Sequence, residues 1–228
     1  MSDKTDYTAA RERMVREQIA PRDISDGRVL DAMLKTPRHL FVPPEERHLA
    51  YIDAPLAIGD GQTISQPYIV ALMTQLLELS GDETVLEIGT GSGYQAAILA
   101  HIVKKVYSVE CIPALANKAN KILSELGIEN VYVEEGDGSR GLPDYAPYEA
   151  IIVTAAAPEA PEPLKEQLAA DGRLVVPVGS RYGQVLERWR RIGEKLVHEQ
   201  IVPVAFVPLV GEHGWNSGDK SSSWWKLF

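Results

Sequence analysis

The residues best suited to chemistry lie in a glycine-rich stretch near the middle of the chain. A short apolar run, 85–88, leads into Gly89, Gly91 and Gly93, and a helix-like segment, 96–102, follows. Because glycine has no Cβ, such a loop can turn sharply and bring backbone N–H groups against a ligand. The N-terminus of the following helix adds partial positive charge. The stretch therefore predicts a nucleoside-cofactor site at the end of a β-strand.

Acidic residues after the next two apolar runs suit the same kind of ligand. Glu110 stands about 20 residues beyond the loop, where an acid at a strand end can hold a ribose diol. Asp137 lies between Gly136 and Gly138 after another apolar run, and Thr154 ends a later one. Because parallel strands present their carboxyl ends at one edge of a sheet, we expect the loop and these side chains to meet there.

The loop itself favours S-adenosylmethionine over a dinucleotide. The dinucleotide fingerprint would place a third glycine at position 94, where this chain has Tyr94. Glu87 directly precedes the loop, and its carboxylate would repel a pyrophosphate. The same carboxylate would attract the ammonium group of S-adenosylmethionine, directly or through water. A glycine turn that closes a strand–helix unit without a ligand is the structural alternative.

Alternating apolar strands and short helices predict an α/β fold with a doubly wound, Rossmann-like sheet. The sheet should be mostly parallel, with late antiparallel strands within 183–192 and 195–209. The expected strands are 83–88, 105–110, 130–135, 149–154 and 173–178, and the expected core helices are 92–103, 113–126 and 161–169. We divide the single domain into an N-terminal helical addition with a catalytic and substrate loop (1–80), a cofactor-binding core (81–210) and an aromatic tail (211–228).

Composition limits the classes of partner and compartment. The 228 residues carry a net charge of −9, which argues against a nucleic-acid duplex as the main partner. The single cysteine, Cys111, allows no internal disulfide or cysteine metal cluster, and its position after a strand predicts a half-buried thiol. The histidines show no metal-ligand spacing. We read no signal peptide in the polar segment 1–16 and no apolar run of membrane length, so the cytoplasm is the expected location.

The N-terminal addition should be helical, with a loop before the core. We expect a helix over 6–20, a second one capped by Ser25 that stops before Pro37, and a short one over 44–51. An amphipathic helix over about 67–79 should follow the loop that contains Ser65. Ser65 is not in a nucleophile elbow, and capping this helix is an alternative to a functional role.

Several segments resemble the protein-L-isoaspartate O-methyltransferase family, over about residues 12–210. The most specific are Gln62–Pro67, with the sequence Gln-Thr-Ile-Ser-Gln-Pro, and Phe206–Leu209, with Phe-Val-Pro-Leu. The glycine loop alone indicates only a class I methyltransferase. The other matching segments are Gly136–Gly138, Ile151–Ala156 and Val176–Gly179.

The resemblance implies methyl transfer from S-adenosylmethionine to the carboxylate of L-isoaspartyl residues in damaged proteins and peptides. The ester then closes to a succinimide and reopens partly as aspartate. Ser65 would be the family's functional serine and would also contact substrate. The residues that the resemblance and the loop chemistry place at the cofactor are Thr63, Glu87, Gly89, Thr90, Gly91, Ser92, Glu110, Asp137 and Gly138. The expected substrate cleft adds Thr154, Val178, Val207 and Pro208.

The chemistry of this acceptor agrees with the residues present. A carboxylate is already ionised at pH 7 and needs no general base, so the protein must mainly align the reacting atoms and exclude water. A hydroxyl such as that of Ser65 can orient the carboxylate without reacting. The alternatives are a class I methyltransferase with a small-molecule acceptor, an NAD-dependent oxidoreductase, and a binding module without turnover. Oligomeric state is open. The tryptophans of the tail should dock in part on the body or on a second subunit, and the alternative is a loose tail, since serine-rich tails are usually disordered.

Overall fold

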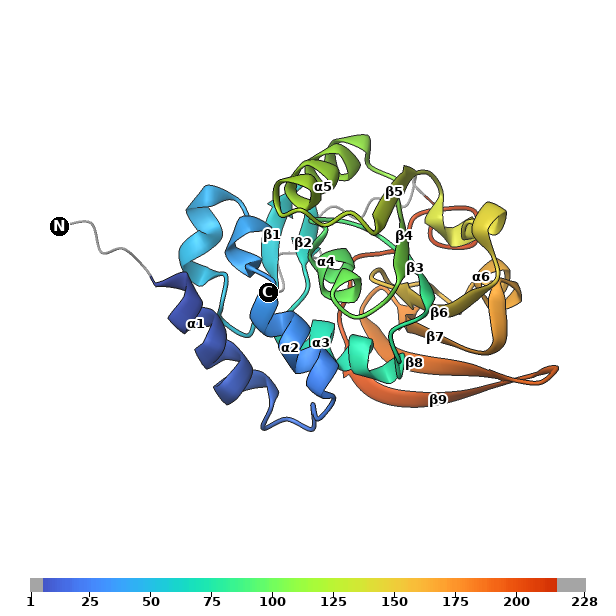
Figure 1. The fold of residues 1–228 in the computed structure, drawn as a ribbon. Helices are drawn as coiled ribbons and strands as arrows, with labels where there is room; N and C mark the ends of the chain where they lie inside the picture. The colour runs from blue at the N-terminus through green and yellow to red at the C-terminus, as the bar shows by residue number, and fades with distance from the viewer. Residues whose placement is uncertain (1–5, 217–228) are drawn as a thin grey trace.

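A seven-stranded sheet forms the centre of the computed structural model, which describes residues 6–216 (Figure 1). Its strands lie in the order β5-β4-β3-β6-β7-β8-β9, with β5 to β7 parallel and β8 and β9 antiparallel. The predicted sheet and its late antiparallel strands are confirmed. The order of the last strands, which the sequence left open, follows the chain from β6 to β9. The bounds are β3 Thr84–Ile88, β4 Lys105–Glu110, β5 Val131–Glu135, β6 Tyr148–Val153, β7 Leu168–Ser180, β8 Gly183–Ile192 and β9 Lys195–Val204.

Helices cover both faces of this sheet, but unequally. The face with α3 (Pro67–Leu76), α4 (Tyr94–Ala100) and α5 (Pro113–Glu125) also receives the N-terminal helices and holds the larger apolar core. The other face packs on α6 (Glu162–Glu166) and on the chain after β6. Short 3-10 turns at Gly138–Arg140 and Pro143–Tyr145 link β5 to β6.

The N-terminal addition is helical, as predicted. Figure 1 shows its blue helices at one side of the molecule beside α3, and the tip of the β8–β9 hairpin at the other. The second helix begins one residue later than expected, because Asp26 rather than Ser25 is the N-cap and accepts the Arg28 N–H at 2.8 Å. The helical segments are α1 (Tyr7–Arg13), a π-helical turn (Met14–Ile19), α2 (Gly27–Lys35) and two 3-10 turns (Arg38–Leu40 and Pro44–Leu49).

A small antiparallel hairpin that the sequence did not predict precedes α3. Its strands, β1 (Leu56–Gly59) and β2 (Gln62–Ile64), are separate from the main sheet. The link from β2 to α3 consists of Ser65 and Gln66. Gln66 is the N-cap of α3, so the alternative in which Ser65 caps this helix is wrong.

The chain after β9 folds back onto the body as far as it is described. The Trp215 indole N–H donates to the Ala156 carbonyl at 3.1 Å, and the Trp215 backbone N–H donates to the Leu209 carbonyl at 2.7 Å. The prediction that the tail docks in part is therefore met at Trp215, whereas Trp224, Trp225 and Phe228 lie outside the described residues. In the range 6–216, no helix combines the length and apolar character needed to span a bilayer.

Candidate functional site

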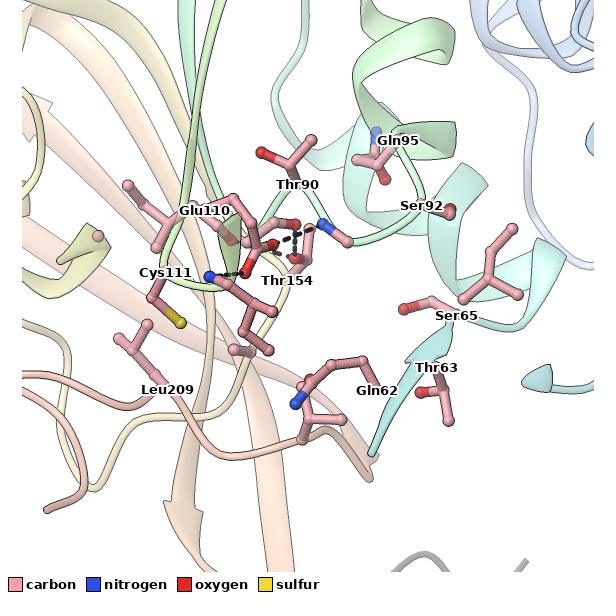
Figure 2. A pocket seen from close by; sticks show the side chains of 18 of the residues that line it. Gln62, Thr63, Ser65, Thr90, Ser92, Gln95, Glu110, Cys111, Thr154 and Leu209 are labelled. Carbon is pink, nitrogen blue, oxygen red and sulfur yellow. Dashed lines mark hydrogen bonds between the residues drawn. The ribbon is translucent and has the colours of Figure 1, made fainter. Parts of the chain in front are cut away.

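A cavity of about 540 Å³ opens at the carboxyl ends of the parallel strands, where the sequence predicts the cofactor site. Figure 2 shows Thr63 and Ser65 on one side of it and Glu110 and Cys111 on the other, with Thr154 between them. Most of the predicted cofactor residues line the cavity. These are Thr63, Gly89, Thr90, Gly91, Ser92, Glu110 and Gly138.

The glycine loop has a backbone that other residues rarely adopt. Gly89, Gly91 and Gly93 have φ values of +92°, +53° and +86°. A Cβ on Gly89 would lie 2.5 Å from the Thr154 hydroxyl oxygen. That hydroxyl lies 2.6 Å from the Gly89 carbonyl oxygen and 3.0 Å from that of Ile88, so Thr154 fastens the loop to the end of β6. The positive φ values and the Thr154 bonds together fix the loop at the edge of the cavity.

Glu110 ends β4 and lies directly beside the loop, in the wall of the cavity. Its carboxylate accepts the Gly91 N–H at 2.8 Å and the Ile112 N–H at 3.0 Å, and each oxygen keeps capacity for another donor. An acid fixed in this way can accept hydrogen bonds from a ribose diol. Cys111 beside it has an exposed surface, more than the half-buried thiol expected, but protein atoms around it still partly desolvate the sulfur. This desolvation and the Glu110 charge raise the pKa of the thiol. A raised pKa disfavours the nucleophilic thiolate.

Glu87 lies behind the cavity, and its side chain is absent from the cavity lining. Alternation along β3 turns Leu86 and Ile88 to one face of the sheet and Glu87 to the α4 face, where it is 0% exposed. Its Oε2 accepts from the Ser108 hydroxyl, and the Ser108 and Thr90 hydroxyl oxygens are 2.6 Å apart. Burial raises the pKa of Glu87 to about 8, so the group is largely protonated at neutral pH. The structure thus connects Glu87 to the loop through Ser108 and Thr90.

The Asp137 carboxylate is held by the chain after β9. One oxygen accepts from the Ser139 backbone N–H at 2.9 Å, and the other accepts from the Glu212 N–H at 2.9 Å. Burial raises the pKa of Asp137, but the bond from the Ser139 hydroxyl at 2.7 Å and these two backbone bonds outweigh it and leave the pKa below its usual value. Gly138 lines the cavity, whereas Asp137 does not. The structure therefore brings the Gly138 backbone to the cavity and holds the Asp137 side chain against the returning tail.

A second cavity of about 360 Å³ adjoins the first at the predicted functional serine. Ser65, Thr63, Thr154 and Val207 line both cavities. Among the described residues, no side chain or backbone group bonds the Ser65 hydroxyl, so it is available to a ligand. Pro208 lines the first cavity, but Val178 lines neither and packs instead against the apolar core on the α6 face of the sheet. Four of the five predicted substrate residues are thus brought together.

Several lining residues were not singled out from the sequence. Gln95 lies in the first turn of α4 and donates its side-chain amide to Thr74 at 2.9 Å. Pro55 and the segment 203–206 form the far wall of the second cavity. Pro203 was the available signal, since proline within a strand favours an edge position, and β9 is the edge strand of the sheet. The described residues contain no cluster of His, Cys, Asp and Glu suited to a metal ion.

Comparisons with known proteins agree with this geometry. A family model described as protein-L-isoaspartate(D-aspartate) O-methyltransferase matches residues 9–214. The chain belongs to this family. Proteins named protein-L-isoaspartate O-methyltransferase are similar to it: one from Desulfotalea psychrophila is 57% identical (92% of this chain, 98% of the relative), and one from Roseiflexus castenholzii is 56% identical (93% and 97%).

Solved structures of the same family have the same fold. One, a protein-L-isoaspartate O-methyltransferase, superposes with a TM-score of 0.81 at 32% identity. The superposition covers 90% of this chain and 67% of the chain of that structure. A second, described as a candidate member from Plasmodium falciparum in complex with S-adenosyl-L-homocysteine, gives a TM-score of 0.75 at 26% identity, with 90% and 98% covered. The Rossmann-like methyltransferase fold is therefore established for this chain.

Proposed function

We propose that this chain, acting in the cytoplasm, transfers the methyl group of S-adenosylmethionine to the side-chain-displaced carboxylate of L-isoaspartyl residues in proteins and peptides. The observation that carries the proposal is the meeting of two cavities at Ser65. The larger has the lining of a nucleoside-cofactor site, and the smaller is open to a second ligand. Family membership supplies the substrate class.

The residues of the larger cavity fit S-adenosylmethionine. Its volume, about 540 Å³, is within the range of small-molecule sites. Ile88, Val109 and Leu209 offer apolar walls to a flat base, and Glu110 offers carboxylate oxygens to a ribose diol. The bound cofactor would supply an electrophilic methyl group on a positively charged sulfur.

The polar groups of this chain then have distinct tasks. The backbone of the glycine loop holds the amino-acid end of the cofactor, with Thr90 and Ser92 beside it. Glu87 acts behind the loop, through its bond to Ser108 and the Ser108–Thr90 contact. At the other end we assign the base to the Gly138 backbone, with Asp137 holding the tail that closes this wall.

Ser65 is the residue that we assign to the acceptor. A carboxylate is ionised at neutral pH, so it needs alignment and loss of water rather than deprotonation. The free Ser65 hydroxyl, at the junction of the cavities, can donate one hydrogen bond that orients the acceptor oxygen. Thr63, Val207 and Pro208 form the remaining walls near this junction. Val178 does not reach the junction; it is partly buried against the apolar core behind the cleft.

A matched pair of peptides tests this function. Labelled S-adenosylmethionine is incubated with the protein and a peptide that contains L-isoaspartate, or with the same peptide containing ordinary aspartate. We expect base-labile label on the isoaspartyl peptide only. Label on neither peptide, from a protein that still binds S-adenosylhomocysteine, would overturn the substrate assignment and point to a small-molecule acceptor or a binding role.

A further inference from the structure

The segment that carries Ser65 is anchored from outside both cavities. Ser65 and Gln66 connect the short strand β2 to α3, and α3 has no capping side chain of its own at Gln66. The N–H groups of the first turn of a helix need acceptors from elsewhere. The residue that supplies these acceptors also helps to hold Ser65 and Gln66, the link between β2 and α3.

Asp53 supplies an acceptor and also holds the neighbour of Ser65. Its Oδ1 accepts the Tyr68 backbone N–H, in the first turn of α3, at 3.0 Å. Its Oδ2 accepts from the Gln66 side-chain amide at 2.7 Å. One carboxylate therefore caps α3 and fixes the residue next to Ser65. Asp53 lines neither of the two cavities.

One arginine pairs with Asp53, and a second fixes the backbone that leads to it. The Arg22 guanidinium forms an ion pair with the Asp53 carboxylate and stacks 3.6 Å from the centre of the Tyr68 ring. Arg38, which is 0% exposed, donates from Nε to the Ala50 carbonyl at 2.9 Å and so fixes the start of the turn that leads to Asp53. Arg22 thus holds the carboxylate directly, Arg38 holds the backbone that leads to it, and the Asp53 side chain is only 17% exposed.

We propose that Asp53 is a positioning residue for methyl transfer, which holds Ser65 at the junction of the cavities by bonding Gln66 and the first turn of α3. The proposal rests on the role proposed above for Ser65. Because misplacing a reacting group by about 1 Å can cost about 100-fold in rate, loss of this anchor should affect turnover more than binding.

The variant Asp53→Ala tests the proposal, and Asp26→Ala is its matched control. Asp26 also caps a helix, α2, by accepting the Arg28 N–H at 2.8 Å, but it makes no contact with the Ser65 link. Both variants should lower the melting temperature, Asp53→Ala by more, because it loses two hydrogen bonds and an ion pair where Asp26→Ala loses one exposed bond. Only Asp53→Ala should lower kcat for the isoaspartyl peptide, by about tenfold or more. Its affinity for S-adenosylhomocysteine, measured by calorimetry, should stay within about twofold of the wild type, because Asp53 lies outside the cofactor cavity.

A double-mutant cycle with Gln66→Ala separates positioning from general loosening. If Asp53 acts partly through Gln66, the double variant should lose less activity than the product of the single losses. A kcat for Asp53→Ala equal to that of Asp26→Ala would overturn the proposal, as would a fall explained entirely by cofactor affinity. Failure of the proposed function would look different, because the wild type itself would then leave the isoaspartyl peptide unmethylated.

Discussion

Replacing Glu87 by glutamine should make the stability of the protein less dependent on pH. Glu87 is 0% exposed, and only its Oε2 has a hydrogen-bond donor among the described residues, the Ser108 hydroxyl. Burial raises its pKa from 4.5 to about 8; the Ser108 bond opposes this shift and the nearby Glu110 charge adds to it. The folded protein therefore keeps a proton on Glu87 at pH values where the unfolded chain has released it.

The sign and size of the effect follow from these two pKa values. Because the folded pKa is the higher one, the free energy of unfolding should fall as pH rises from about 4.5 to about 8, and level off above that. Between pH 6 and pH 8, the titration of Glu87 should lower the free energy of unfolding of the wild type by about 2 kcal/mol. Glutamine does not titrate, so Glu87→Gln should lack this part of the loss.

Urea unfolding of the wild type and of Glu87→Gln at pH 6 and pH 8 measures the difference. Histidines and other groups titrate in both proteins, so their contributions cancel in the comparison. Glu83→Gln is a useful control. Burial raises the pKa of Glu83, but its bonds from Ser80 and Gly81 outweigh this and lower the pKa overall, so the group stays ionised at both pH values.

Glu83→Gln should therefore shift the free energy of unfolding by the same amount at pH 6 and pH 8. If the stabilities of the wild type and of Glu87→Gln instead changed in parallel between these pH values, Glu87 would not be protonated in the folded state. The reasoning from its burial would then be refuted.

Two further substitutions test the cofactor loop. Gly89→Ala should destabilise the fold by about 2 kcal/mol or more, because the backbone is at φ +92° and the new Cβ would lie 2.5 Å from the Thr154 oxygen. Thermal unfolding beside Gly59→Ala, where φ is +98° but the space is open, isolates the collision; equal losses would contradict it. Glu110→Gln should weaken S-adenosylhomocysteine binding about tenfold, since an amide cannot accept from Gly91, Ile112 and a ribose diol together. Unchanged affinity in calorimetry would remove Glu110 from the cofactor site.

The fold could be predicted largely from local pattern. Apolar runs of five or six residues alternate with glycines and with segments whose apolar residues have helical spacing. These runs predicted the bounds of β3 to β6 to within one or two residues. The β1–β2 hairpin was missed because its strands have four and three residues, too few for a pattern to emerge. The cap of α2 was placed one residue early because Ser25 and Asp26 are both good caps, and only the backbone geometry distinguishes them.

The site was predictable where it depends on the backbone and less so where it depends on side-chain direction. Strand ends placed Gly89, Glu110 and Thr154 at one edge, which topology alone requires. Whether the Glu87 side chain reaches the cavity depends on which face of β3 it occupies. The position of the Asp137 side chain depends on a hydrogen bond from a tail more than seventy residues later in the chain. Such long-range contacts leave no local signal. The exposure of Cys111 was also misjudged, because it lies just past the buried end of β4.

The most direct test of the account is the Ser65→Ala variant with an isoaspartyl peptide and labelled S-adenosylmethionine, measured together with its affinity for S-adenosylhomocysteine. Ser65 lies where the two cavities meet, and its hydroxyl has no protein partner among the described residues. The account predicts that kcat falls about 100-fold while cofactor affinity stays within about twofold. Wild-type turnover, or equal losses of turnover and cofactor affinity, would contradict it.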